Sequence, residues 1–221
     1  MTTADVPVAL PATARSGAFW IERWSPLSGL LFVIGAVALA LTPAGDDTGE
    51  TAAEVVSFAR SNDAWMAVAA VFALVALVLT GWFVAGLYAR LRNAGSGTEA
   101  VLALIGGVAF CLLFFRALTI WSTPLIDIEK DETTALAQAA TYLTIDDIGW
   151  VALGGAGVGA GLMAIAASLG ALRAQWVPAW AGWVGVALGV ASFATITFVG
   201  MFAWLAWIVA ASVVLLARGA R

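Results

Sequence analysis

Arg116 is a charged side chain well inside a long apolar run, and an ionisable residue in such a run is a candidate functional site. Asp146 and Asp147, at the start of the next apolar run, are its expected partners. Successive residues lie about 100° apart on a helix, so at most one of them faces Arg116 well, and we favour Asp147. Three roles remain open: the pair clamps two helices, Arg116 reaches up to the outer surface, or its guanidinium receives an anionic head group.

The residue types that are missing exclude much enzymatic chemistry. The chain has no histidine, and its one cysteine, Cys111, lies in an apolar run. Histidine-ligated haem, imidazole-ligated zinc or copper and Ser–His–Asp triads are therefore excluded, and we expect no cofactor. Ser192, Thr195 and Thr197 have no base near them in the sequence, and no carboxylate lies near the middle of an apolar run to couple an ion to transport. We therefore expect a protein that is not an enzyme.

Two acidic clusters lie in the polar gaps between apolar runs. They are Asp46, Asp47 and Glu50, and Asp127, Glu129, Asp131 and Glu132. Carboxylates hold divalent cations weakly on their own, but neither cluster has the ordered spacing and turn glycine of a calcium loop. We interpret both as solvated loop charge that helps to orient the chain, and we expect no metal site.

Glycines four residues apart recur in two apolar runs. They are Gly155, Gly157, Gly159 and Gly161 in one run, and Gly185 and Gly189 in the next. Such spacing lets helix backbones approach closely, so we interpret these residues as helix-packing positions within the bundle or across a homodimer. The alternative is a hinge or a discontinuous helix of a transporter.

The composition predicts that lipid surrounds the chain. Hydrophobic residues make up 62% of the 221 positions and charged residues 11%, against roughly 45–50% and 25% in soluble domains. A crossing needs about 20 apolar residues. The runs predict crossings at 27–41, 65–87, 100–121 and 148–172, with Pro26 at an early helical position.

The last apolar run, 176–217, is too long for one crossing. As a single helix it would measure about 63 Å, twice the ~30 Å hydrocarbon core. It therefore contains two crossings, which reverse near 195–200. We predict an all-α membrane protein with a bundle of six transmembrane helices over residues 25–218, a cytoplasmic N-terminal segment 1–24 and a cytoplasmic tail 219–221.

The charges predict how the chain is oriented. Most of the basic residues fall in gaps on one side of the six crossings: Arg15, Arg23, Arg90, Arg92, Arg173, Arg218 and Arg221. Because basic loops stay on the cytoplasmic side, both termini are expected to be cytoplasmic, in a bacterial cytoplasmic membrane. On the other side, the segments 50–62 and 132–143 have helical apolar spacing. Each predicts either a short amphipathic outer helix or a helical extension of the following crossing.

Six short motifs carry a resemblance to a known group. They are AAEVVSFAR at 52–60, YARLR at 88–92, DIG at 147–149, LGALR at 169–173, PAWAGW at 178–183 and RGAR at 218–221. The set resembles a group of uncharacterised integral membrane proteins of high-GC Gram-positive bacteria, of the domain-of-unknown-function type. That resemblance implies a membrane bundle and no catalytic residue.

Two functions therefore compete. The favoured one is a non-enzymatic accessory or interaction subunit whose outer loops and glycine faces bind partners. The alternative is a small transporter, or a lipid or apolar-anion binding protein, with an outward-facing site near Arg116. An intramembrane enzyme is disfavoured. The expected partners are membrane lipid and either further copies of the chain or another membrane protein, with no nucleic acid.

Overall fold

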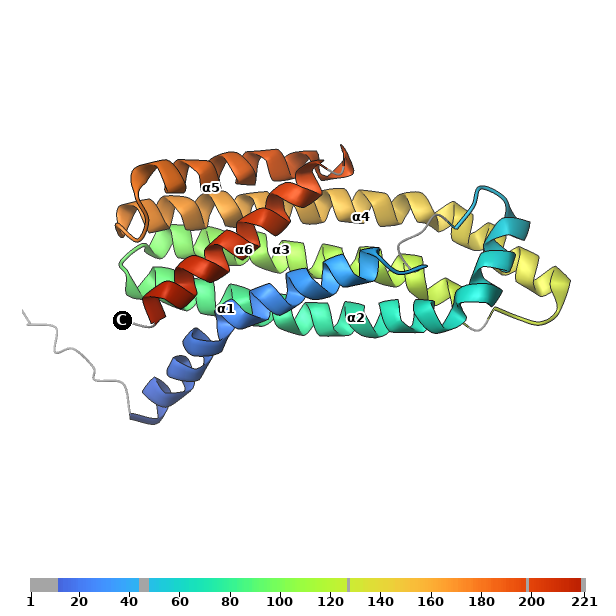
Figure 1. The fold of residues 1–221 in the computed structure, drawn as a ribbon, viewed down its shortest axis with the longest axis horizontal. Coiled ribbons are helices and arrows are strands. Elements are labelled where there is room, and N and C mark those ends of the chain that lie inside the picture. The colour runs from blue at the N-terminus through green and yellow to red at the C-terminus, as the bar shows by residue number, and fades with distance from the viewer. Residues whose placement is uncertain (1–11, 44–47, 127, 198, 220–221) are drawn as a thin grey trace, which may run out of the picture.

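The computed structural model describes residues 12–43, 48–126, 128–197 and 199–219, and these residues contain helices and no strand (Figure 1). The elements are α1 (Ala12–Ala40), α2 (Ala52–Asn93), α3 (Gly97–Ser122), the 3-10 turn η2 (Thr123–Leu125), α4 (Glu132–Arg173), α5 (Ala179–Ala191), the 3-10 turn η3 (Ser192–Thr197) and α6 (Val199–Gly219). The prediction of an all-helical chain is confirmed.

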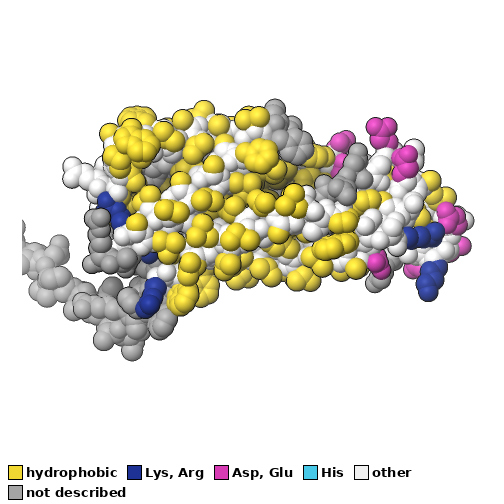
Figure 2. Space-filling model, in the orientation of Figure 1, with side chains coloured by type: hydrophobic (Ala, Val, Ile, Leu, Met, Phe, Trp, Pro, Cys, Tyr) yellow, Lys and Arg dark blue, Asp and Glu magenta, His cyan; other side chains and the backbone are white. Residues whose placement is uncertain are grey.

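Five of the helices, α1, α2, α3, α4 and α6, are long and apolar enough to cross a membrane. The apolar stretch that contains α5 is shorter and ends at Thr195. Large apolar side chains are exposed along the helices, and those of Ile34, Val78 and Val151 are 62–71% exposed. Figure 2 shows hydrophobic side chains over most of the length of the molecule and acidic side chains gathered at one end. These features indicate a membrane protein.

Helix α4 lies at the centre of the bundle. It packs against α2, α3, α5 and α6, and most extensively against α3. In its most apolar stretch 61% of the residues are buried, compared with 28–39% in the other four long helices. The small residues of α4 allow this position, because neighbouring backbones can approach it from several sides.

An aromatic cluster fills the space between α1, α3 and α6. Phe32, Phe110, Phe114 and Trp204 pack with ring centroids 5.1–6.0 Å apart, mostly edge to face. All four side chains are buried, and they belong to the main apolar cluster of the bundle. Buried edge-to-face pairs are favourable beyond their area, so this cluster holds α1 and α6 onto α3.

The turns after α2 and α4 share one hydrogen-bond pattern. After α2, Ser96 N–H donates to Leu91 O and Gly95 N–H to Arg92 O, and Gly95 takes a φ of +79°. After α4, Trp176 N–H donates to Ala171 O and Gln175 N–H to Leu172 O, with a φ of 54° at Gln175. Both turns satisfy the last helical carbonyls in the same way. Glycine adopts the left-handed conformation at Gly95 without strain, whereas Gln175 adopts it at a cost of about 1 kcal/mol.

The reversal of the last apolar run lies where the sequence predicts it. Residues of η3, Ser192–Thr197, separate α5 from α6. Ser192 Oγ donates to Leu188 O at 2.8 Å, and Thr195 Oγ1 donates to Ser192 O at 2.5 Å. These hydroxyl groups are satisfied by the local backbone, as they must be in an apolar environment.

Helix α1 differs from its prediction. It begins at Ala12, and Pro26 lies inside it, whereas the sequence suggested an early helical position for this proline. Proline removes one backbone hydrogen bond but does not prevent helix on both sides of it. Figure 1 shows that α1 changes direction between its first part and the part that packs on the bundle.

The segment before the fourth crossing is a helical extension of that crossing, whereas the segment before the second crossing is a short helix that a kink separates from it. Both α2 and α4 have 42 residues, and an unbroken helix of that length is about 63 Å long, twice the thickness of a bilayer core. Helix α4 runs on from Glu132 without a break, whereas α2 is interrupted at Asn62, which has φ −129° and ψ 19°. Both helices therefore project beyond the apolar belt at the same end (Figure 1).

Candidate functional site

The projecting ends form a small unit that we call the acidic cap, made of residues 48–66, 125–126 and 128–143. It has an apolar cluster separate from that of the bundle: Val55, Val56, Ala59, Met66, Leu125, Ala135, Ala139 and Tyr142. These side chains come from α2, η2 and α4. Because the cap buries its own apolar residues, it is a defined surface and not a pair of loose loops.

Two capping interactions start the helices of the cap. Thr51 Oγ1 accepts from Glu54 N–H at 3.3 Å, and Glu54 Oε2 accepts from Thr51 N–H at 3.0 Å, which is a capping box. Asp131 caps α4 by accepting from Thr134 N–H and Thr134 Oγ1, both at 2.9 Å. The hydrogen bonds from Thr51 lower the pKa of Glu54, and those from Thr134 lower the pKa of Asp131, because they favour the carboxylate form.

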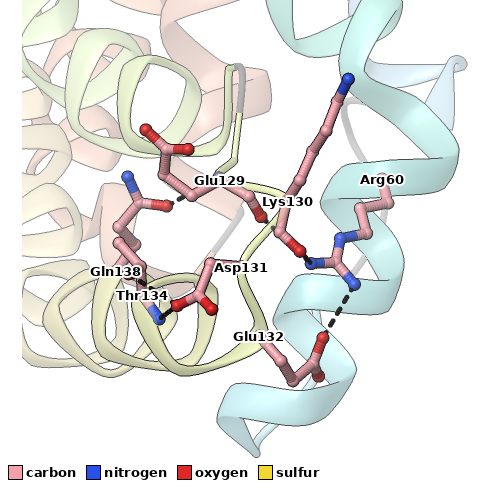
Figure 3. A network of polar contacts seen from close by, with 7 residues as sticks. All are labelled: Arg60, Glu129, Lys130, Asp131, Glu132, Thr134 and Gln138. Carbon is pink, nitrogen blue, oxygen red and sulfur yellow. Dashed lines mark hydrogen bonds and ion pairs between the residues drawn. The ribbon is translucent and has the colours of Figure 1, made fainter.

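A polar network joins α2 to the segment that leads into α4 (Figure 3). Arg60 Nη1 contacts Glu132 Oε2 at 3.1 Å, and Arg60 Nη2 donates to Glu129 O at 3.0 Å. Glu129 N–H in turn donates to Gln138 Oε1 at 3.0 Å. The two ion-pair side chains are 40% and 66% exposed, so the pair contributes at most about 1 kcal/mol. The network therefore aligns the connecting segment, while the apolar cluster supplies most of the stability.

The exposed side of the acidic cap carries mainly carboxylates. Its described acids are all exposed: Glu50, Glu54, Asp63, Glu129, Asp131 and Glu132. Its basic residues are Arg60, which is engaged in the network, and the exposed Lys130. The cap therefore presents a negative surface at the end of the molecule that Figure 2 shows in magenta.

The structure shows no ion pair between Arg116 and either of its expected partners. The ion pairs between described residues are Arg60–Glu132 and Arg173–Glu99, and Arg116 is not in one. Phe114 and Ala117 of α3 are buried, and Arg116 lies on the exposed side of the helix. On α4, Gly149 faces α3 at this level and packs against the Trp121 ring.

The same orientation of α4 determines where Asp146 and Asp147 lie. Asp147 is exposed and Asp146 is half-buried. Because Gly149 takes the position that faces α3, an acid two residues earlier lies on another side of the helix. The expected Arg116–Asp147 ion pair is therefore not formed. The chemistry that the sequence suggests for these residues, a site for an anionic ligand, stays a prediction.

Sequence reasoning missed the ion pair between Glu99 and Arg173. Glu99, in the first turn of α3, is only 7% exposed, and its carboxylate contacts the guanidinium of Arg173 in the last turn of α4. Beside it, Ser96 Oγ donates to Gly170 O at 3.3 Å. The sequence did contain a signal for this ion pair. Glu99 begins one apolar run and Arg173 ends the next, so the two charges were expected at the same end of two neighbouring helices.

The glycines of α4 lie on two faces of the helix, and each face packs against a different neighbour. Gly155 and Gly159 face α3, and a Cβ on Gly159 would lie 2.6 Å from Phe110 N and 2.8 Å from Gly106 O. On the other face a Cβ on Gly161 would lie 2.5 Å from Gly189 O in α5, and one on Gly157 would collide with Thr195. On α5, Gly185 packs against Ser168 of α4. Every glycine that the sequence singled out thus lies at a close helix contact within one chain.

The acidic clusters give no metal site in the part of the chain that the structure describes. Among those residues no group of three or more His, Cys, Asp or Glu side chains could hold a metal ion. Asp46, Asp47 and Asp127 lie outside the described residues. The described acids instead form part of the negative surface of the acidic cap.

Comparisons of this chain with protein-family models, with curated proteins and with solved structures find no match. The suggested membership of a bacterial membrane-protein group therefore remains a prediction.

Proposed function

We propose that this chain is a six-span protein of the bacterial cytoplasmic membrane, with both termini cytoplasmic, and that it is a non-enzymatic interaction subunit. In this proposal the acidic cap is the part that binds a partner protein on the outer side. The observation that carries the proposal is that the cap has its own apolar cluster and an exposed carboxylate surface. A folded, charged unit outside the apolar belt fits partner recognition better than it fits chemistry.

Hydrogen bonds at the inner end support six crossings. Arg218 Nε, at the end of α6, donates to Trp176 O, just before α5, at 3.0 Å. Arg90 Nη1, at the end of α2, donates to Leu215 O in α6 at 2.7 Å. If α6 crosses the membrane, α5 and η3 must return across it, because the start of α5 lies beside the end of α6. The arginines then lie at the cytoplasmic end, as the positive-inside rule requires.

Reporter fusions test this threading. A reporter fused after Arg221 should be active only in its cytoplasmic form, and one inserted at Gly49 only in its periplasmic or external form, since an odd number of crossings separates them. A reporter at Gly95 should match the one at Arg221, because the turn after α2 belongs to the same end. Finding the Gly49 and Arg221 reporters on one side would overturn the six-span proposal.

The partner proposed here has a positively charged surface. Charge complementarity speeds association and excludes partners of the wrong sign, so a carboxylate surface selects for basic segments of another membrane or envelope protein. Arg60, Glu54, Asp131 and Glu132 build the cap, as their hydrogen bonds show. Glu50, Asp63 and Glu129 present exposed carboxylates. Asp63 Oδ1 accepts from Ala64 N–H at 2.6 Å, a hydrogen bond that the amide oxygen of Asp63→Asn can keep, so these three can be neutralised without disrupting the network of the cap.

Photo-crosslinking in whole cells tests the role of the cap. A photoreactive side chain at the exposed Thr133 should give one discrete protein adduct, and the same group at the exposed Ala206 of α6 should give none of that size. The combination Glu50→Gln, Asp63→Asn and Glu129→Gln should reduce the Thr133 adduct several-fold at unchanged protein level, because electrostatic steering is lost. An adduct that survives neutralisation, or reaction with lipid alone, would argue against the proposal.

A ligand site at Arg116 has weaker support than the cap. The cavity described below lies between α4, α5 and α6, and Arg116 is not among its lining residues. The outward-facing lipid or anion site is therefore the alternative function. It becomes the better proposal if the crosslinking experiment at the cap gives no protein adduct.

A further inference from the structure

An apolar groove lies between α4, α5 and α6, toward the end of the bundle that carries the turns after α2 and α4. Its volume is about 240 Å³. Ala167, Ser168 and Ala171 of α4 lie at its floor, and side chains of α5 and α6 form its walls. The groove is separate from the acidic cap. A role for it depends on the chain lying in a membrane and not on a partner of the cap.

The course of α6 explains why the groove is open. Helices α5 and α6 meet at η3, and α6 then runs obliquely to α5 across the bundle (Figure 1). Helix α5 stays close to α4, because Gly182 packs on Leu172 and Gly185 on Ser168. The floor on α4 therefore stays open between α5 and α6. Trp176 and Trp180 lie at the end of the groove where α5 begins.

The lining offers an occupant almost no hydrogen bonding. Its polar side-chain groups are Ser168 and the indoles of Trp176, Trp180 and Trp207. Ser168 and Trp207 satisfy each other, since Trp207 Nε1 donates to Ser168 Oγ at 3.1 Å, and the other two indoles lie at the end of the groove where α5 begins. The volume of about 240 Å³ is below the roughly 300–1,000 Å³ of pockets that enclose a drug-sized ligand. Such a groove suits a slender hydrocarbon chain that enters from the side.

A guanidinium lies beside the end of this groove. Arg218 donates from Nε to Trp176 O at 3.0 Å and from Nη2 to Gln175 O at 3.0 Å. Trp176 is itself a lining residue. Arg218 is exposed, forms no ion pair with a described acid, and its Nη1 donates to no described residue. A held cation with donors to spare binds a phosphate oxygen well.

We infer that the groove binds one acyl chain of an anionic phospholipid whose phosphate contacts Arg218. The apolar walls take the chain, and the guanidinium selects the charge of the head group. A transmembrane helix of a second copy is the competing occupant, but a helix about 10 Å wide fits this volume poorly and leaves Arg218 without an anion.

Native mass spectrometry of the delipidated full chain in mild detergent tests the inference, with phosphatidylglycerol and phosphatidylcholine of identical acyl chains as probes. We expect one phosphatidylglycerol to bind about tenfold more tightly than phosphatidylcholine, because the choline cation of the latter offsets the phosphate charge and is repelled by the Arg218 guanidinium. Arg218→Gln should abolish that preference and Arg218→Lys should keep most of it. Ala210→Phe, in the α6 wall, should weaken both lipids, whereas Ala206→Phe, on the same helix but outside the lining, should weaken neither.

Thermal unfolding of each variant verifies that it is folded. If Ala210→Phe does not fold, Arg218→Gln, at an exposed position, still tests whether the groove prefers the anionic lipid. Equal affinity for the two lipids in the parent chain would overturn the inference. So would a preference that survives Arg218→Gln, or equal effects of Ala210→Phe and Ala206→Phe. A dimer that Ala210→Phe dissociates would replace the lipid by a second copy.

Discussion

Gly159→Ala is expected to destabilise the protein by about 2–3 kcal/mol, because the added methyl group has no space. Its Cβ would lie 2.6 Å from Phe110 N and 2.8 Å from Gly106 O, so it meets the backbone of α3. Backbone atoms cannot rotate away, and the two central helices must separate along their contact. The measurement is the unfolding free energy in a fixed detergent, from SDS titration or from thermal unfolding.

Gly155→Ala is the matched control in the same helix and on the same face. Its Cβ would lie 2.9 Å from Leu113 Cδ1, the far end of a side chain that can change rotamer. Alanine is favoured over glycine in a helix by about 1 kcal/mol, so this change should be nearly neutral or slightly stabilising. Gly81→Ala, with no neighbour within 4 Å, measures that helix term alone. Similar stabilities for Gly159→Ala and Gly155→Ala would show that the helices are not in close contact there.

Arg173→Gln is expected to destabilise the protein by about 1–3 kcal/mol, since it leaves the buried Glu99 carboxylate without its cation. Glu99 is 7% exposed, and the side chain of Arg173 is 71% exposed, so the effect should fall in the lower part of that range because water reaches the pair. Glu99→Gln should cost less, as it removes the buried charge. The double variant should cost less than the sum of the two single variants, and unfolding in detergent measures all three.

Arg60→Gln provides the comparison for the second pair. The partners Arg60 and Glu132 are 40% and 66% exposed, and the loss of such an ion pair should cost less than about 1 kcal/mol. Strict additivity of Glu99→Gln and Arg173→Gln, or an effect of Arg173→Gln no larger than that of Arg60→Gln, would contradict a buried role for Glu99.

The sequence alone was sufficient for the helical class and for most element positions. Long apolar runs can satisfy their backbone groups in lipid only as helices, so runs and their lengths predict the elements directly. The division of 176–217 illustrates this, because a single helix would be twice as long as the membrane is thick. The turn at η3, Ser192–Thr197, lies at that division. The helical spacing of 132–143 likewise predicted helix, which α4 contains as an extension.

Only the tertiary structure decided which face each helix presents. In lipid the surroundings of a helix are as apolar as its neighbours, so hydrophobic periodicity does not mark the buried side. For this reason Arg116, expected to face an acid, lies on the exposed side of α3, and Glu99, for which the sequence suggested no partner, lies buried against α4. The packing of glycines had a sequence signal in their spacing, but the partner position Gly106 had none. The groove depends on the oblique course of α6, which follows from packing among three helices and not from any one segment.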